Sequence, residues 1–261
     1  MNIQNFISKA IAKWKIFIAI FIMLTLLAVI YNAFAEKYYK SSIRIYEIKE
    51  SNFMNNASSG LLGIIGGSET MDNGWYGLKL LRSRDLLEDF IQSYGSNKIL
   101  YKYYGEEVKN LSAETQTNIA YSIVSEDLQI LPKQDGVTQV NFIHKDKTVP
   151  AEFLDGLIKY IDNYVREKDI TDKTNFINNL DLKISNQPNQ MVDKALSKLY
   201  ENNLQELLII ESRNEYVFGI IDSPRFPYNH YYPNLNILLV ISLLISLALH
   251  SIYIFYKYDE D

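Results

Sequence analysis

"IFIAIFIMLTLLAVIYNAFA", Ile16 to Ala35, is a run of twenty residues without a charge, and "LNILLVISLLISLALHSIYIFY", Leu235 to Tyr256, is a second run of twenty-two. A helix rises about 1.5 Å per residue, so roughly twenty residues cross a hydrocarbon core of about 30 Å. Neither run shows the polar face that a buried helix of a soluble protein normally carries. The sequence therefore predicts two transmembrane helices, at residues 16–35 and 235–256.

The lysines before the first run predict the orientation. Residues 1–15 carry Lys9, Lys13 and Lys15 and no acidic residue. Basic residues favour the cytoplasmic side, so this segment is expected in the cytoplasm, and two spans return the tail, residues 257–261, to the same side. A signal peptide cleaved after Ala35 is the alternative. Because signal peptides have shorter apolar cores of about 7–15 residues, an uncleaved anchor is expected.

The segment between the spans is predicted to lie outside the cytoplasm. It consists of a domain, residues 36–222, and a proline-rich connector, residues 223–234. Together these residues hold 22 Lys and Arg against 28 Asp and Glu, and this net charge of −6 argues against nucleic acid as a partner. The chain has no cysteine, so it has no disulfide framework, and a domain of this size can bury a sufficient core without one.

Alternating patterns predict strands in the outer domain. Residues 39–48, "YKSSIRIYEI", alternate apolar and polar side chains, and residues 119–130, 137–143 and 215–222 have a similar β-rich character. Residues 77–95 are predicted to form a helix in which Ser83 is an N-cap. The Gly-, Ser- and Asn-rich segment between the first strand and this helix is predicted to be a long loop.

From Pro150 onward the apolar pattern becomes helical. Phe153, Leu157, Ile161 and Val165 recur every four residues, and after a break at Pro188 a second helical pattern follows. An antiparallel hairpin over about residues 150–214 would have an arm of roughly 50 Å. The expected fold is α+β, with two transmembrane helices flanking an extracytoplasmic α/β base domain, a long projecting helical hairpin, and a sheet near the membrane.

Three of the six prolines lie within ten residues, at Pro224, Pro227 and Pro233. Each proline fixes φ near about −65° and biases the preceding residue toward extended geometry. The connector is therefore predicted to be a stiff, extended link between the last strand and the second span, rather than a flexible tether.

The sequence offers little that resembles catalytic chemistry. The three histidines are scattered, and the metalloprotease, nucleophile-elbow and cysteine-pair motifs are absent. "GLLGIIGG" lacks the lysine of a phosphate-binding loop and is interpreted as a plain loop. His250 lies in the second apolar run, where a polar side chain suggests function, although its place near the end of the run also fits an interfacial position. No catalytic, cofactor-binding or metal-binding residue is predicted.

Several segments together resemble the polysaccharide co-polymerase family, the Wzz-type chain-length determinants of bacterial surface polysaccharides. "LKLLRSRDLLEDFI" is similar to the family's Leu-x-Ser-Arg helix, with Ser83 and Arg84 at the motif positions. Val149 and Pro150 stand where the family has Asp-Pro at the start of a helix. "FGIIDSPRFP", which includes Asp222, is similar to the family's proline-rich approach to the second span.

The resemblance implies a function without catalysis. It implies a homo-oligomeric ring in the bacterial inner membrane, with both termini cytoplasmic and the main domain periplasmic. Such a ring sets the length of an O-antigen-like glycan made on a lipid carrier by a separate membrane polymerase. Two alternatives stay open: a capsule or exopolysaccharide export component of the same architecture, and a two-span extracytoplasmic sensor. The five-residue tail argues against the sensor, which needs a cytoplasmic output.

Overall fold

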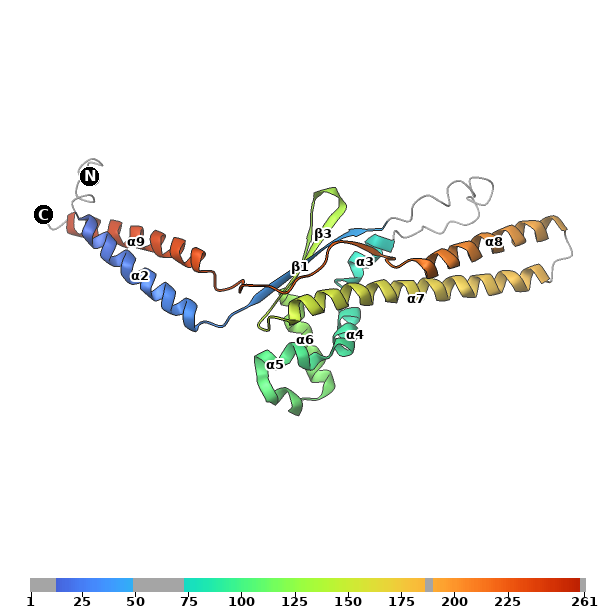
Figure 1. Cartoon of the computed structure of the whole chain (residues 1–261), viewed down its shortest axis with the longest axis horizontal. Helices are drawn as coiled ribbons and strands as arrows, with labels where there is room; N and C mark the ends of the chain where they lie inside the picture. The colour runs from blue at the N-terminus through green and yellow to red at the C-terminus, as the bar shows by residue number, and fades with distance from the viewer. Residues whose placement is uncertain (1–12, 49–72, 186–189, 259–261) are drawn as a thin grey trace. The chain divides into compact units, whose positions relative to one another are not determined.

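The computed structural model describes residues 13–48, 73–185 and 190–258. The chain divides into two compact units, each of which is described by itself (Figure 1). The first, called here the two-helix unit, comprises residues 1–39 and 228–261, and the second, the sheet unit, comprises residues 40–227. The predicted loop after the first strand and the predicted break at Pro188 fall largely or wholly outside the described residues.

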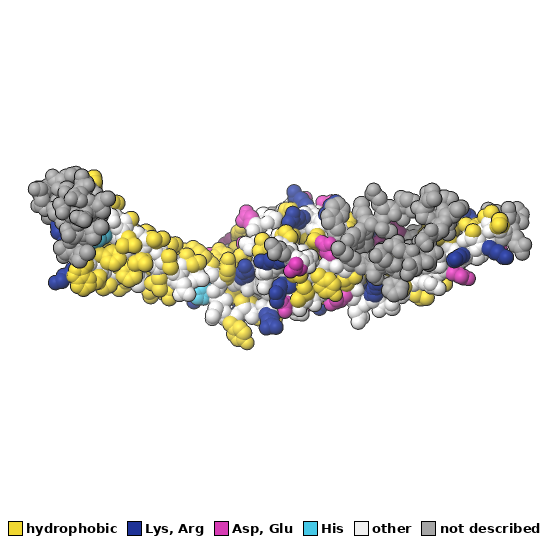
Figure 2. All heavy atoms as spheres, turned by 90° about the horizontal axis from the view of Figure 1, so that it is seen from above, with side chains coloured by type: hydrophobic (Ala, Val, Ile, Leu, Met, Phe, Trp, Pro, Cys, Tyr) yellow, Lys and Arg dark blue, Asp and Glu magenta, His cyan; other side chains and the backbone are white. Residues whose placement is uncertain are grey.

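Two long helices form the described part of the two-helix unit. They are α2, Trp14–Phe34, and α9, Leu235–Tyr258, and they coincide within a few residues with the two predicted runs. Both are long and apolar enough to cross a membrane. The surface of this unit in Figure 2, at the left of the view, is mostly hydrophobic, as expected for helices surrounded by lipid.

One face of α9 packs against α2. Ser242, Ser246, His250 and Ile254 follow one another at intervals of four, and each is less than 10% exposed. Residues four apart share a helix face, and small residues at this spacing allow close helix approach in a membrane. The rings of His250 and Phe17 meet edge to face with 5.8 Å between their centroids. His250 therefore faces the neighbouring helix and not the lipid.

A four-stranded sheet is the base of the sheet unit. Its strands lie in the order β2-β3-β1-β4, with bounds β1 Tyr39–Glu47, β2 Leu128–Pro132, β3 Val137–His144 and β4 Phe218–Asp222. β2 pairs with β3 and β1 with β4, both antiparallel. The predicted strands at 39–48, 137–143 and 215–222 are confirmed in outline, and the last two share one sheet with β1 between them.

The predicted strand at residues 119–130 is wrong. A helix, α6, occupies Ala113–Asp127, and the strand is confined to β2. Ser112 caps this helix by accepting a hydrogen bond from the N–H of Thr115 at 3.2 Å. Thr117, Ala120 and Val124 are buried at helical spacing. The β-branched residues of this segment favoured a strand, but its N-cap and its packing determine the structure.

Several short helices precede α6. The predicted helix at 77–95 is two helices, α3 Asn73–Leu80 and α4 Arg84–Tyr94. The segment between α4 and α6, for which no structure was predicted, forms α5, Ser96–Tyr104, and a 3₁₀ helix, Gly105–Asn110. Glycines with positive φ, Gly95 (101°) and Gly105 (58°), separate these elements, because non-glycine residues rarely adopt that backbone conformation.

The predicted helical hairpin is observed as α7, Val149–Ser185, and α8, Gln190–Ser212. The 37 residues of α7 correspond to a length of about 55 Å. Figure 1 shows the two helices side by side and extending beyond the sheet. Lys173 of α7 links the pair through an ion pair with Glu206 and a 3.2 Å hydrogen bond to the side-chain oxygen of Asn203 on α8.

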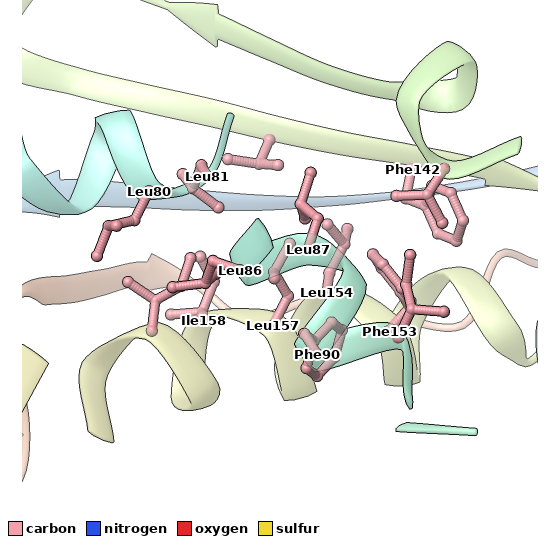
Figure 3. Close-up of a cluster of buried hydrophobic side chains, with 14 of the residues drawn as sticks. Leu80, Leu81, Leu86, Leu87, Phe90, Phe142, Phe153, Leu154, Leu157 and Ile158 are labelled. Atoms are coloured by element: carbon pink, nitrogen blue, oxygen red, sulfur yellow. The ribbon is translucent and has the colours of Figure 1, made fainter. Parts of the chain in front are cut away.

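The hydrophobic core lies where α4 and the first half of α7 cover the sheet. Figure 3 shows leucines of α4 and α7 directed toward one another, with aromatic rings at one end of the cluster. Phe153 of α7 lies 5.1 Å from Phe90 of α4 and 4.4 Å from Phe142 of β3, measured between ring centroids. The fully buried side chains of this core include Ile43, Ile45, Leu81, Ile91, Phe142, Phe153, Leu154, Leu157 and Ile161.

Candidate functional site

Ser83 and Arg84, the motif residues, lie at the start of α4. Ser83 is its N-cap, as predicted, with an extended backbone (φ −74°, ψ 124°). Its carbonyl accepts the N–H of Leu87 at 3.0 Å, whereas its side chain makes no capping bond. Arg84 donates from Nε to Oε1 of Glu88 at 2.6 Å, and its guanidinium lies 5.1 Å from the ring centre of Tyr121 on α6. Arg84 is thus held at the surface between α4 and α6.

Pro150 is the second residue of α7 and is buried. A proline in the first turn of a helix removes no helical hydrogen bond and has a suitable φ. Asp146 shapes the turn before it, because Oδ1 accepts bonds from the N–H and the hydroxyl of Thr148, both at 2.9 Å. Burial alone would raise the pKa of Asp146. The bonds from Thr148 and the nearby His144 and Lys102 outweigh burial and lower this pKa.

His144, at the end of β3, is completely buried. Its Nε2 lies 2.8 Å from the carbonyl oxygen of Ile99, and its Nδ1 accepts the N–H of Asp146 at 2.9 Å. An imidazole that donates from one nitrogen and accepts at the other is neutral. Burial lowers the pKa of His144, although its bond to Ile99 and the charge of Asp146 partly oppose this shift. His144 therefore joins β3, α5 and the turn before α7 in its neutral form.

Asp222 ends β4 and stands opposite Arg44 of β1 in the strand register, where the two side chains form an ion pair. Their side chains are 40% and 54% exposed. Solvent screens such a pair, so it contributes at most about 1 kcal/mol to stability. We therefore regard it as an aid to strand register.

The connector is bonded to the start of β1 on both sides of the boundary between the units. In the sheet unit, Ser41 Oγ donates to the carbonyl of Arg225 at 2.9 Å, between Pro224 and Pro227. In the two-helix unit, the N–H of Tyr38 donates to the carbonyl of Tyr232 at 2.9 Å, next to the buried Pro233, whose peptide bond is cis.

The connector is not straight over its whole length, because the chain bends at residues 228, 229, 231 and 233. Hydrogen bonds to the start of β1 support the connector in addition to its prolines. The sequence pattern did not indicate this pairing. The stiffening role of Pro224, Pro227 and Pro233 stays a prediction.

The motif residues do not form one site. Ser83 and Arg84 begin α4, Pro150 begins α7, and Asp222 ends β4. Within the described part of the chain, no hydrogen bond or ion pair joins Arg84 to Asp222, or either of them to Pro150. Each residue instead fixes the start or end of one element.

Sequence reasoning missed a polar cluster at the base of the hairpin, the Asp162 cluster. It consists of Asp162 and Arg166 of α7 and the backbone N–H groups of Tyr216 and Val217. Oδ1 of Asp162 accepts both N–H groups, at 2.8 and 2.7 Å. Oδ2 accepts Nη2 of Arg166 at 2.8 Å, and the same nitrogen donates to the carbonyl of Asn214 at 3.0 Å.

The Asp162 cluster is largely buried, with Asp162 only 7% exposed. A buried carboxylate is stabilised only where hydrogen bonds and a counter-charge replace its water. The sequence contains an indication of this cluster. Asp162 interrupts the apolar pattern between Ile161 and Val165, and Arg166 follows it four residues later. The cluster fixes how the chain returns from α8 into β4.

The described residues show no metal-binding arrangement. Over residues 13–48, 73–185 and 190–258, no group of three or more His, Cys, Asp and Glu side chains is placed to hold a metal ion. The features that the structure brings together are linkages between elements: the start of α4, the turn before α7, the Asp162 cluster and the connector.

The N-terminal part of this chain is similar to a known protein family. Residues 1–107 match the model of the Wzz family, described as chain length determinant protein. These residues include the first span, β1 and the Ser83-Arg84 motif. The resemblance indicated by the sequence is therefore confirmed for the N-terminal part of the chain. The comparison with curated proteins gives no match.

Solved structures with a similar chain path include polysaccharide co-polymerases. One is a full-length bacterial polysaccharide co-polymerase, 15% identical, with 94% of each chain covered and a TM-score of 0.41. Another is a fragment of WzzB, a polysaccharide co-polymerase from Salmonella Typhimurium. It is 14% identical, with 76% of this chain and 100% of that chain covered and a TM-score of 0.34. Both are distant neighbours of this chain.

Proposed function

We propose that this protein regulates the chain length of a bacterial surface polysaccharide of the O-antigen type. It acts without catalysis, as an oligomeric membrane scaffold beside a polymerase and its lipid-linked glycan. The observation that carries the proposal is the match of residues 1–107 to the chain length determinant family. Two helices suited to crossing a membrane, one on each side of the sheet unit in the sequence, support it.

The proposed location is the bacterial inner membrane, with both termini in the cytoplasm and the sheet unit in the periplasm. Lys9, Lys13 and Lys15 support this orientation. Reporter fusions at Asp261 and near Asp135 should give cytoplasmic and periplasmic signals, respectively. A periplasmic signal at Asp261, or cleavage after Ala35, would contradict the orientation.

Self-association into a ring is part of the proposal. The acidic segment between the spans cannot attract copies of itself by charge, so assembly must use shape and apolar contacts. α8 offers such contacts, because Leu204, Leu208 and Ile209 are 38%, 56% and 45% exposed. A particle that stays monomeric in mild detergent over a wide concentration range would argue against a ring.

The decisive experiment deletes the gene and separates the cell's surface polysaccharide by gel electrophoresis. We expect a lost or shifted length mode, restored by the intact gene. Complete loss of surface polysaccharide would instead favour an export component of the same architecture. An unchanged pattern would contradict both functions.

A further inference from the structure

A polar groove of about 700 Å³ lies on the sheet unit between α4, α5 and α6. Small-molecule sites in proteins are commonly about 300–1,000 Å³, so this groove could hold a ligand of that size. Eleven residues line it, and nine of them have side chains that donate or accept hydrogen bonds; the other two are Gly95 and Ala113. The motif residue Arg84 is one of the nine.

The floor of the groove is held in place by internal bonds. Ser96 and Thr117 are buried, and their hydroxyl oxygens lie 3.3 Å apart. Thr117 also donates to the carbonyl of Ala113 at 3.0 Å. The side-chain nitrogen of Gln116 donates to the carbonyls of Val108 and Leu111, both at 3.0 Å. Such a floor does not need to reorganise when a ligand binds, which favours affinity.

The rim of the groove carries three amide side chains. Gln92, Asn97 and Asn118 are exposed, and within the described part of the chain their side chains make no hydrogen bond. Each amide offers two N–H donors and one carbonyl acceptor. Groups of this kind match the hydroxyls of a sugar, since every hydroxyl both donates and accepts.

The charges of the groove limit the class of ligand. Arg84 is paired with Glu88, so its charge is largely balanced, and Glu114 of α6 adds a negative charge to the lining. An acidic ligand such as a uronate would be repelled. An apolar ligand or peptide anchor would find no hydrophobic or aromatic side chain among the lining residues apart from Ala113. A neutral, polyhydroxylated ligand fits best.

We propose that this groove is a subsite for neutral sugar residues of the glycan whose length the protein controls. The inference rests on the proposed function and adds a place of direct glycan contact. Sugar sites of high affinity usually stack the ring on an aromatic face, which this groove lacks. Binding should therefore be weak, with a Kd on the order of millimolar. Weak binding lets a growing chain leave again.

Saturation-transfer NMR on the full chain in mild detergent tests the proposal. The probes are a neutral glucose trisaccharide, a neutral N-acetylglucosamine trisaccharide and a galacturonate trisaccharide, each titrated to tens of millimolar (~10 × the expected Kd). The variant Gln92→Ala/Asn118→Ala removes two rim amides. Asn175→Ala/Asn178→Ala is the matched control, because both asparagines are exposed on α7.

We expect saturable binding of at least one neutral probe and weaker binding of the uronate. Loss of two amide bonds should raise the Kd about tenfold in the rim variant and leave the control unchanged. The single change Asn97→Ala provides an independent reading if the double variant is unstable. The proposal is overturned if no neutral probe binds, if the uronate binds best, or if the rim and control variants bind alike.

The gene deletion separates this inference from the proposed function. If the deletion shifts the length mode but the rim variants bind sugar like the wild type, the proposed glycan subsite is contradicted and the proposed function stands. If the deletion has no effect on glycan length, the proposed function is contradicted, whatever the binding experiments show.

Discussion

Oδ1 of Asp162 accepts the backbone N–H of Val217, 55 residues further along the chain, at a distance of 2.7 Å. The intervening residues include the second half of α7 and the whole of α8. This one contact, with its neighbours in the Asp162 cluster, fixes where the hairpin ends and β4 begins. Since β4 leads into the connector, the geometry of the cluster sets the start of the path toward the second span.

Replacing Asp162 with Ala should destabilise the sheet unit strongly. The change leaves two buried N–H groups and the largely buried Arg166 without their acceptor, which costs about 3–5 kcal/mol. Thermal unfolding of the full chain in detergent, followed by circular dichroism, should show a melting temperature lower by roughly 6–20 °C. Asp162→Asn keeps an acceptor oxygen and should lose less.

Asp155→Ala is the matched control for this change. Asp155 also lies on α7 and also pairs with a basic residue four positions later, Lys159, but both side chains are exposed. An exposed pair of this kind is worth under about 1 kcal/mol. Equal losses in the Asp155 and Asp162 variants would show that burial of the cluster is irrelevant.

Because His144 is buried, we expect the folded protein to lose stability in mild acid. Its folded pKa lies below the ordinary 6.5, so between these two values the unfolded chain binds a proton that the folded chain does not. Stability therefore falls as the pH drops below about 6.5 and continues to fall until the folded pKa is reached. Melting temperatures of the wild type between pH 7.5 and 5.5 should decrease.

The variant His144→Phe should have a flatter pH profile, although it is less stable at neutral pH because two hydrogen bonds are lost. His230→Gln, in the connector, should keep the slope of the wild type. A wild-type slope in His144→Phe would assign the acid sensitivity to another group.

Gly77 of α3 lies where the surrounding side chains leave no space for a larger residue. A Cβ atom at this position would lie 2.3 Å from Cγ1 of the buried Val217 and 2.7 Å from the ring of Phe218. Gly77→Ala should therefore cost about 1–3 kcal/mol through overpacking, despite the better helix propensity of alanine. Gly156→Ala is the comparison: its Cβ would lie 3.2 Å from the ring of Phe90, a tight contact that needs a smaller shift, so it should lose less stability than Gly77→Ala in the same unfolding measurement.

The connector prolines are expected to influence glycan length and not folding. Pro224→Ala/Pro227→Ala lets the chain sample more backbone states between β4 and the second span. We expect normal protein levels, an almost unchanged melting temperature and a broader or shorter distribution of glycan lengths on a gel. Pro132→Ala, at the exposed end of β2, is the control. A wild-type distribution of glycan lengths in the connector variant would show that the stiffness given by these prolines does not influence glycan length.

Features with strong local periodicity were predictable from the sequence. The two spans follow from long apolar runs, β1 from an alternating apolar and polar pattern, and the helical hairpin from apolar residues at helical spacing. Each of these patterns leaves a single secondary structure. Residues 113–127 show why the rest was harder. Their β-branched side chains favour a strand in isolation, whereas burial of Thr117, Ala120 and Val124 against the core selects the helix.

The polar contacts between distant residues were the least predictable. Asp162 meets Val217, and Ser41 meets Arg225, only because the sheet and the hairpin bring together segments far apart in the chain. The partner in such a bond cannot be predicted from the residues next to it in the sequence. The groove is a similar case, because its residues come from three helices, of which the sequence pattern predicted only one.

The buried serines of α9 bear on how firmly the two spans hold each other. Ser242 Oγ donates to the carbonyl of Leu238, and Ser246 Oγ to that of Leu243, each at 2.8 Å. Both hydroxyls are therefore satisfied inside their own helix. Separating α9 from α2 at these serines would leave no unpaired hydroxyl in the hydrocarbon, and lipid tails are as apolar as leucine. At these two serines the pairing of α9 with α2 therefore rests on close packing and not on hydrogen bonds between the helices.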